Sequence, residues 1–423
     1  MLTHQVHQPW NGRALWCGGW LLAAVWAAGF PLISTLETHR VWGVSAAVGY
    51  LCAAAAALWM PRAGARTVSV ALALAGAVAL PFLYLLLTGS AQSEVAVIER
   101  SGQLLIQQAT PYLADPRTVT DVTPYLPGMA LLGLPRAVFA ADGRLPQLLG
   151  DARLWCAAAF FACLWSGRRV LRLPADRESG RTGRAFPYGT ALGVLTASPI
   201  LALPLCVSGV DLPLAGLLCL ALALAARRRP AAAGLALAAA CSLKWTAWPA
   251  VAVAVSLLAY GAGRRAALRC AGVSVAGTAL ALLPSALLSP GPMVEQVLAF
   301  PTGRGELRTP ASSPLPGRLL ADLGPYGWYA AVGLLLAGGL VVGVSLVLRP
   351  PCDLVSAADR LAAGLCLAFL LAPAGRFGYL ALPVVLVVWA RLVRAGQRPA
   401  PVASRLVRAA VPGRRQLSAG GAR

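Results

Sequence analysis

One stretch of the sequence, CSLKWTAWPA at residues 241–250, contains the single lysine of the chain. Lys244 lies in a long and almost wholly apolar segment, and every other basic residue of the 36 is an arginine. Trp245 and Trp248 flank it, and tryptophan favours the boundary between membrane and water. A cation held at that depth suits the anionic headgroup of a lipid, such as a phosphate. The alternative is a lysine that snorkels to the surface and only terminates a hairpin.

Two acids in SEVAVIERSG, Glu94 and Glu99, form the second candidate group. Residues 93–108 predict an amphipathic helix capped by Ser93. At 100° per residue, Glu94 shares a face with apolar residues such as Ile98, whereas Glu99 is turned about 140° away. We therefore expect Glu94 to point toward the helix bundle and Glu99 to point toward water.

A half-buried carboxylate is costly unless it is used or paired. For Glu94 the alternative to a functional role is a structural salt bridge to Arg100 or Arg153. For Glu99 the alternative is an ordinary solvated surface acid.

Further candidates come from three short segments. TDVTPYLPG supplies Asp121 and Tyr125, LAPAGRFGYLALP supplies Arg376, and SSPLPGRLL supplies Arg318. Arg376 falls in a predicted short turn between the last two apolar segments, so it could reach the same outer surface as Lys244, and Arg318 could do likewise. Each has a purely structural alternative, and together on one face they indicate a site for an anionic ligand.

The composition indicates which elements position these residues. With 58% hydrophobic residues, 12% charged residues and a mean hydropathy of +0.70, the chain carries more apolar surface than a soluble core can bury. Solid apolar runs, without the alternation of barrel strands, predict an all-α polytopic membrane bundle. We expect about twelve transmembrane helices, near residues 13–33, 41–60, 67–87, 151–165, 188–208, 211–226, 231–243, 246–262, 268–288, 327–348, 357–372 and 377–391.

The net charge of +21 is explained by topology, without a nucleic-acid partner. When the arginine clusters face the cytoplasm, as the positive-inside rule requires, both termini are cytoplasmic and 25 arginines oppose four acids on that side. Keeping the clusters around residues 227–229 and 264–269 on one side requires two short helices that turn at Lys244. The protein is expected in the cell membrane, among lipids.

Two long external loops are predicted, at about 88–150 and 289–325, within a transmembrane domain of residues 1–394. Residues 395–423 read as a basic, flexible cytoplasmic tail. The ten cysteines fall almost entirely in apolar spans, and the three histidines, His4, His7 and His39, are scattered. No metal-ligand spacing is present, and neither is a nucleotide-binding or hydrolase motif. We therefore predict no cofactor, although a divalent metal remains compatible with the pattern.

Several of these residues resemble a known family, the polyprenyl-phosphate-sugar-dependent glycosyltransferases of family 87, of actinobacterial type and with the GT-C fold. In that family an acid precedes a Pro-Tyr pair and then a Tyr-Pro-Pro-like element, and a later segment reads Leu-Lys-x-x-x-x-x-Pro. The matching positions here are Glu94, Pro111, Tyr112, Tyr125, Pro127, Leu243, Lys244 and Pro249. The chain departs from the pattern in two ways: the family acid is usually aspartate, and its loop usually follows the first span instead of the third.

The resemblance implies a membrane glycosyltransferase acting on the outer face. It would move a sugar, a mannose-like hexose or a pentose, from a polyprenyl phosphate to a glycolipid or cell-envelope glycan. Glu94 would be the general base, and Lys244, Arg376 and Arg318 would hold the donor phosphate. The substrates would be contacted by the residues Glu99, Arg100, Tyr112, Asp121, Tyr125 and Trp245.

Three other functions fit parts of the pattern. A lipid or small-molecule transporter or flippase would use broken helices in symmetric pairs, and the turn at Lys244 is one such break without an evident counterpart. A glycan polymerase or ligase would also act on lipid-linked sugars outside the membrane. A non-catalytic scaffold is the third.

Overall fold

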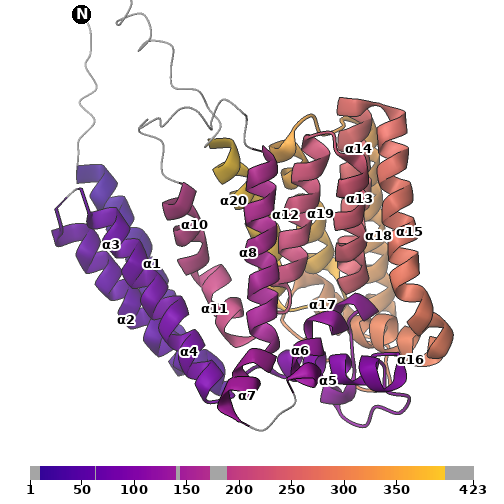
Figure 1. Cartoon of the computed structure of the whole chain (residues 1–423), viewed down its shortest axis with the longest axis horizontal. Helices are drawn as coiled ribbons and strands as arrows, with labels where there is room; N and C mark the ends of the chain where they lie inside the picture. The colour runs from indigo at the N-terminus through magenta and orange to yellow at the C-terminus, as the bar shows by residue number, and fades with distance from the viewer. Residues whose placement is uncertain (1–9, 62, 140–142, 172–187, 396–423) are drawn as a thin grey trace, which may run out of the picture.

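The computed structural model describes residues 10–61, 63–139, 143–171 and 188–395. Across these ranges the chain is helical, with long helices running between two ends of a bundle (Figure 1). The described residues form no strand, and their one β-bridge joins Ser312 to Gly375. The predicted all-α membrane bundle is confirmed.

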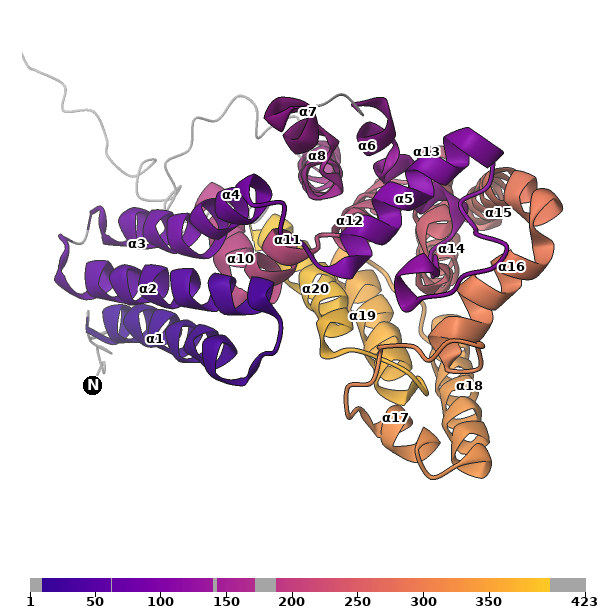
Figure 2. The same cartoon turned by 90° about the horizontal axis from the view of Figure 1, so that it is seen from below.

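The N-terminal helices stand together on one side of the molecule (Figure 2). They are α1 (Trp10–Ile33), α2 (Glu37–Trp59), α3 (Ala65–Leu74), the π-helical segment η1 (Ala75–Ala79) and α4 (Leu80–Leu87). Gly49 of α2 and Gly76 of η1 allow this packing, because a Cβ on Gly49 would lie 2.6 Å from the Gly76 Cα.

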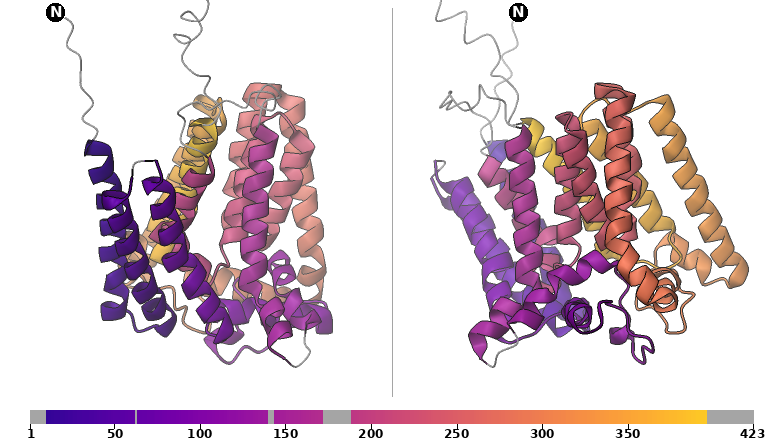
Figure 3. Two further views of the ribbon diagram at one scale, coloured as in Figure 1. Left: turned by 60° about the vertical axis from the view of Figure 1, so that its left-hand side comes forward. Right: turned by 45° about the vertical axis from the view of Figure 1, so that its right-hand side comes forward.

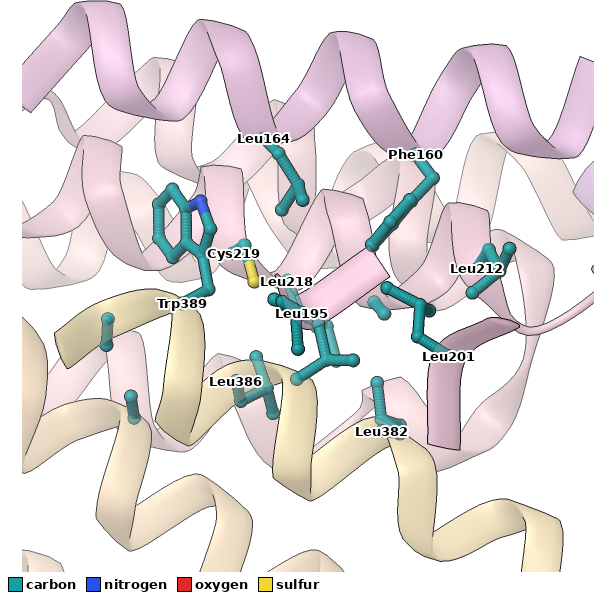
Figure 4. Packing of buried hydrophobic residues seen from close by; sticks show 14 of the residues in the cluster. Phe160, Leu164, Leu195, Leu201, Leu212, Leu218, Cys219, Leu382, Leu386 and Trp389 are labelled. Carbon is teal, nitrogen blue, oxygen red and sulfur yellow. The ribbon is translucent and has the colours of Figure 1, made fainter. Parts of the chain in front are cut away.

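The remaining long helices form the larger part of the bundle. They are α8 (Ala152–Leu171), α10 (Tyr188–Ala197), α11 (Pro199–Val207), α12 (Leu212–Ala226), α13 (Pro230–Leu243), α14 (Pro249–Ala262), α15 (Arg264–Leu288), α18 (Pro325–Leu348), α19 (Leu354–Leu371) and α20 (Ala381–Ala395). Helix α12 lies at the centre, where Leu218 and Cys219 pack against Phe160, Leu386 and Trp389 (Figure 4).

Each of the twelve predicted spans corresponds to helical structure, but not all are long enough to cross a membrane alone. Eight described helices meet that length and composition, or ten if each of two bent pairs is one span. The predicted span 188–208 is one such pair, bent by 66° between α10 and α11. Pro199 begins α11 and lacks the N–H that would continue the helix from α10. Helices α12 and α13 are shorter, with 15 and 14 residues.

Both predicted external loops gather at the same end of the bundle (Figure 3). The first contains α5 (Ser93–Gln108), η2 (Val119–Asp121), η3 (Pro127–Leu132), α6 (Leu134–Val138) and α7 (Arg144–Gly150). The second contains α16 (Pro290–Val294), η5 (Glu295–Ala299), η6 (Phe300–Thr302) and α17 (Pro316–Ala321). We call the end of the bundle that carries both loops the loop end. The start of α1 and the close of α20 lie at the opposite end (Figure 1).

The two loops are held together by buried polar contacts. The Gln296 side chain accepts a hydrogen bond from the Thr123 N–H at 2.9 Å and donates one to the Leu113 carbonyl at 2.7 Å. The Thr110 and Ser289 hydroxyls lie 2.5 Å apart. Because Gln296 is almost fully buried, these bonds fix the loops relative to each other.

One sequence prediction lies almost wholly outside the described residues, and another is wrong. The predicted tail at 395–423 lies, apart from Ala395, outside the described residues. Ser93 does not cap α5: it is the first helical residue, and Gln92 occupies the capping position without a side-chain hydrogen bond to the helix backbone.

Candidate functional site

Lys244 occupies the turn that the sequence predicts. Helix α13 ends at Leu243, Lys244 is extended (φ −156°, ψ 134°), and the short helix η4 (Trp245–Ala247) leads into α14 at Pro249. The Trp248 indole N–H donates to the Cys241 carbonyl at 3.2 Å across the turn. The Leu126 N–H donates to the Leu243 carbonyl at 3.0 Å, which attaches the first loop to this turn.

The Lys244 side chain points into the protein, and it does not snorkel outward. Only 14% of it is exposed, and its Nζ lies 2.9 Å from Oδ1 of Asp211. Nζ also lies 4.6 Å from the ring centre of Tyr379 and 5.7 Å from that of Tyr125, within range of cation–π attraction. Burial lowers the pKa of Lys244, but Asp211 and Tyr379 together outweigh burial, and the pKa lies above its usual value.

Glu94 forms an ion pair with Arg376. Its two expected partners pair elsewhere: Arg100 with Asp121, and Arg153 with Asp151. Glu94 lies in the first turn of α5, with 18% of its side chain exposed, and Arg376 precedes the short helix η7 (Phe377–Leu380) between α19 and α20. The pair therefore joins the first loop to the last turn of the bundle. Glu94 does point toward the bundle, as the helical periodicity predicts.

The two ion pairs meet around two tyrosines. Burial raises the pKa of Tyr125, and the nearby carboxylates of Asp211 and Glu94 raise it further. Tyr379 raises the pKa of Lys244, and Arg376 lowers it. We call Glu94, Arg376, Asp211, Lys244, Tyr125 and Tyr379 the ion-pair cluster. Lys244 lies over the ring of Tyr125, and Glu94, far from it in the chain, is close enough to raise the pKa of the same tyrosine.

Hydrogen bonds from both loops hold the cluster in place. The buried Tyr112 hydroxyl donates to the Tyr125 carbonyl at 2.9 Å. The Ser313 N–H donates to the Gly375 carbonyl at 3.0 Å, and the Gly375 N–H donates to the Ala311 carbonyl at 3.1 Å. The first loop thus holds Tyr125, and the second loop holds Gly375, the residue before Arg376.

Glu99 corrects one sequence prediction, because it does not face water. Only 18% of its side chain is exposed, and Arg136 lies 3.6 Å from its carboxylate. Its Oε1 accepts a hydrogen bond from the Ala152 N–H at 3.1 Å, at the first residue of α8. Burial raises the pKa of Glu99 above its usual value. Glu99 thus attaches α5 to α8, on the side of α5 away from Glu94.

Other predicted site residues occupy two separate positions in the loops. Arg100 and Asp121 pair with each other at 3.6 Å, and hydrogen bonds from the Thr118 hydroxyl and N–H lower the pKa of Asp121. Arg318 pairs with Asp322 at 2.7 Å, one helical turn away in the sequence. Trp245 packs beside buried Tyr112 and Leu126.

Two members of the cluster were missed by sequence reasoning. Asp211 immediately precedes α12. An acid at the start of so apolar a segment is a sequence feature that could have identified it as a candidate. Tyr379 follows Arg376 by three residues in the turn that was already singled out. In addition, His39 of α2 lies 2.6 Å from the Gln92 side chain, which brings the N-terminal helices against the start of α5.

The described residues contain no group of three His, Cys, Asp or Glu side chains that could hold a metal ion. The ion-pair cluster offers two cations and two carboxylates in a largely buried setting. Such an arrangement can bind an anion through Lys244 and Arg376 while presenting a carboxylate oxygen to a second ligand.

Comparisons with known proteins place the chain in a family. The model of glycosyltransferase family 87 matches residues 123–373, which is more than half of the chain. The matched region includes Tyr125, Asp211 and Lys244, whereas Glu94 and Arg376 lie outside it. No curated protein and no solved structure matches the chain. The chain is a multi-pass membrane protein that belongs to glycosyltransferase family 87.

Proposed function

We propose that this protein transfers a sugar from a polyprenyl-phosphate donor to a glycolipid or cell-envelope glycan acceptor at the outer face of the cell membrane. The observation that carries this proposal is the convergence of Glu94–Arg376 and Asp211–Lys244 around Tyr125, at the end of the bundle that holds both long loops. The loop end then faces outward, and both termini face the cytoplasm.

The donor class follows from the charges. A lipid monophosphate presents one phosphate at the membrane surface, and the cluster offers a lysine and an arginine from neighbouring turns to receive it. The apolar tail of such a donor would stay in the surrounding bilayer, so the site needs no pocket for a nucleotide. Charge that builds on the departing phosphate can be stabilised by the two cations alone.

The reaction requires one carboxylate. The acceptor hydroxyl oxygen forms a bond to the anomeric carbon while the bond from that carbon to the phosphate oxygen breaks. The electron pair of the broken bond leaves with the phosphate, where Lys244 and Arg376 stabilise it. The acceptor proton passes to Glu94, and a well-placed base of this kind contributes about 10²- to 10⁴-fold to the rate.

Both cations are paired with acids, and this suggests how the site is prepared. The Glu94–Arg376 pair engages a carboxylate oxygen that the base needs. A donor phosphate that draws Arg376 toward itself would release that oxygen for the acceptor hydroxyl. Donor binding and base activation are therefore coupled through one guanidinium group.

The other predicted substrate contacts surround this centre. Tyr125 is nearest, within the cluster itself. Tyr112 and Trp245 lie behind it, and Arg100 with Asp121 forms a polar pair farther along the first loop. We propose that the acceptor glycan lies along this side of the loop, where the side chains of Arg100 and Asp121 are partly exposed.

Purified protein in liposomes tests the donor class. We expect radiolabelled sugar to move from a polyprenyl phosphate to a glycolipid acceptor, and no transfer from a nucleotide sugar when the lipid donor is absent. Transfer from a nucleotide sugar alone would contradict the proposal. Movement of the labelled donor between leaflets without transfer would instead support a flippase.

A further inference from the structure

A concave site lies at the opposite end of the bundle from the ion-pair cluster. A cavity of about 270 Å³ opens where α8, α12, α14 and α20 end and α19 begins. Three arginines line it: Arg227 and Arg228, which follow α12, and Arg394 of α20. Figure 1 shows these helix ends together, on the side away from α5 and α16.

The charges around this cavity are unbalanced. Its one acid, Asp353, is already engaged, because Arg394 lies 3.0 Å from its Oδ2 and the Ser356 N–H donates to its Oδ1 at 2.8 Å. Within the described residues, the side chains of Arg227 and Arg228 have neither a hydrogen-bond nor an ion-pair partner. Two guanidinium groups at the mouth of the cavity are thus available to an anion.

Arg228 has a backbone conformation that is unfavourable for any residue other than glycine. Its φ is +55°, in the left-handed region that glycine favours. The Arg229 N–H donates to the Leu224 carbonyl and the Arg228 N–H to the Ala225 carbonyl, which is the hydrogen-bond pattern of a Schellman motif. Glycine is usual at the residue that Arg228 occupies, so the guanidinium is present at a cost to the fold.

The floor of the cavity is apolar. Leu171, Leu257 and Leu258 line it and are nearly fully buried, and Leu354 and Val355 close one side. The volume is below the range of pockets that enclose a drug-sized ligand, so a whole sugar nucleotide would not fit. A charged mouth above a small apolar floor matches a phosphate group attached to an apolar chain.

We propose that this cavity binds the phosphate group of an anionic lipid in the leaflet opposite the ion-pair cluster. Arg227 and Arg228 hold the phosphate oxygens, and the apolar floor receives the first carbons of the lipid. Free phosphate would meet the same two arginines, so the experiment separates these sources. The site does not depend on the transferase mechanism, because it shares no residue with it.

The experiment uses the full-length protein purified in a neutral detergent and measures Tm during titration with phosphatidylglycerol, with phosphatidylcholine or with inorganic phosphate. We expect phosphatidylglycerol to raise Tm and phosphatidylcholine to leave it nearly unchanged. An equal rise with inorganic phosphate would support the anion site and identify soluble phosphate as its ligand. No rise with either anion would overturn the proposal.

Arg228→Gly is the decisive variant, because it removes the guanidinium and also relieves the backbone. We expect its Tm without lipid to equal or exceed that of the wild type, and its apparent affinity for phosphatidylglycerol to fall roughly tenfold or more. The matched control is Arg265→Gln, an exposed arginine of α15 at the same end but outside the cavity. Equal losses in the two variants, or none in Arg228→Gly, would overturn the site.

Discussion

Glu94 and Arg376 form an ion pair across 282 residues of sequence, joining the first turn of α5 to the turn before α20. Each side chain is partly buried, so the pair is shielded from water more than a surface salt bridge. The contact closes the first loop onto the last turn of the bundle and also engages the carboxylate proposed as the base.

Arg376→Gln separates the structural from the chemical role of this pair. The variant leaves the Glu94 carboxylate half-buried without its partner, so we expect Tm to fall and kcat/KM for the lipid donor to fall by about 10- to 100-fold. Adding Glu94→Gln should restore much of the Tm but none of the transfer. A double variant that regains transfer would contradict the roles assigned to both residues.

Asp211→Asn tests whether the donor phosphate replaces an internal counter-ion. Without Asp211, Lys244 is buried with no carboxylate beside it, and we expect the free energy of unfolding to fall by about 1–3 kcal/mol. A polyprenyl phosphate should then raise Tm more in Asp211→Asn than in the wild type. An equal or smaller rise would show that the phosphate does not bind at Lys244.

Gly133→Ala tests how closely α5 must pack to position Glu94. A Cβ at Gly133 would collide with the Ile98 carbonyl of α5, and the ordinary φ of −91° means that alanine is otherwise acceptable there. We expect a loss of about 1–3 kcal/mol in the free energy of unfolding, with reduced transfer. Gly333→Ala, inside α18 where a Cβ would meet nothing within 4 Å, is the control: transfer should not change, and the free energy of unfolding should stay the same or rise by up to about 1 kcal/mol.

Glu99→Gln gives a prediction for pH. Folding raises the pKa of Glu99, so the native protein holds this proton more tightly than the unfolded chain, and wild-type stability falls as pH rises from the usual to the raised value. Glutamine does not titrate, and its oxygen can still accept the Ala152 N–H. The Tm difference between Glu99→Gln and wild type should therefore shift in favour of the variant as pH rises from the usual carboxyl pKa toward the raised pKa of Glu99. A difference that does not vary with pH would contradict a raised pKa for Glu99 in the native protein.

Much of the architecture could be predicted from local pattern. Apolar runs gave the helices, the arginine clusters required the turn at Lys244, and the periodicity of residues 93–108 oriented Glu94. The bend at Pro199 could not be predicted, because the apolar pattern continues across the proline. The exposure of Glu99 was predicted wrongly because periodicity in one helix does not reveal that α6 and α8 cover its other face.

The partners of the charged residues were the least predictable feature. Asp211 and Lys244 are 33 residues apart, and Glu94 and Arg376 much farther, so their pairing depends on how α5, α12, α13 and α20 pack. No spacing in the sequence encodes such contacts. By contrast, Arg318 and Asp322 are one helical turn apart, a local pairing that the sequence does contain.

Glu94→Gln compared with Glu99→Gln tests the central claim most directly. Both acids lie on α5, both have 18% of the side chain exposed and both pair with an arginine, but only Glu94 belongs to the ion-pair cluster and affects the pKa of Tyr125. In liposomes supplied with radiolabelled polyprenyl-phosphate sugar, we expect Glu94→Gln to lose about 10²-fold or more of the transfer rate and Glu99→Gln to remain near wild type. Equal rates of transfer by Glu94→Gln and the wild type would show that Glu94 is not the base.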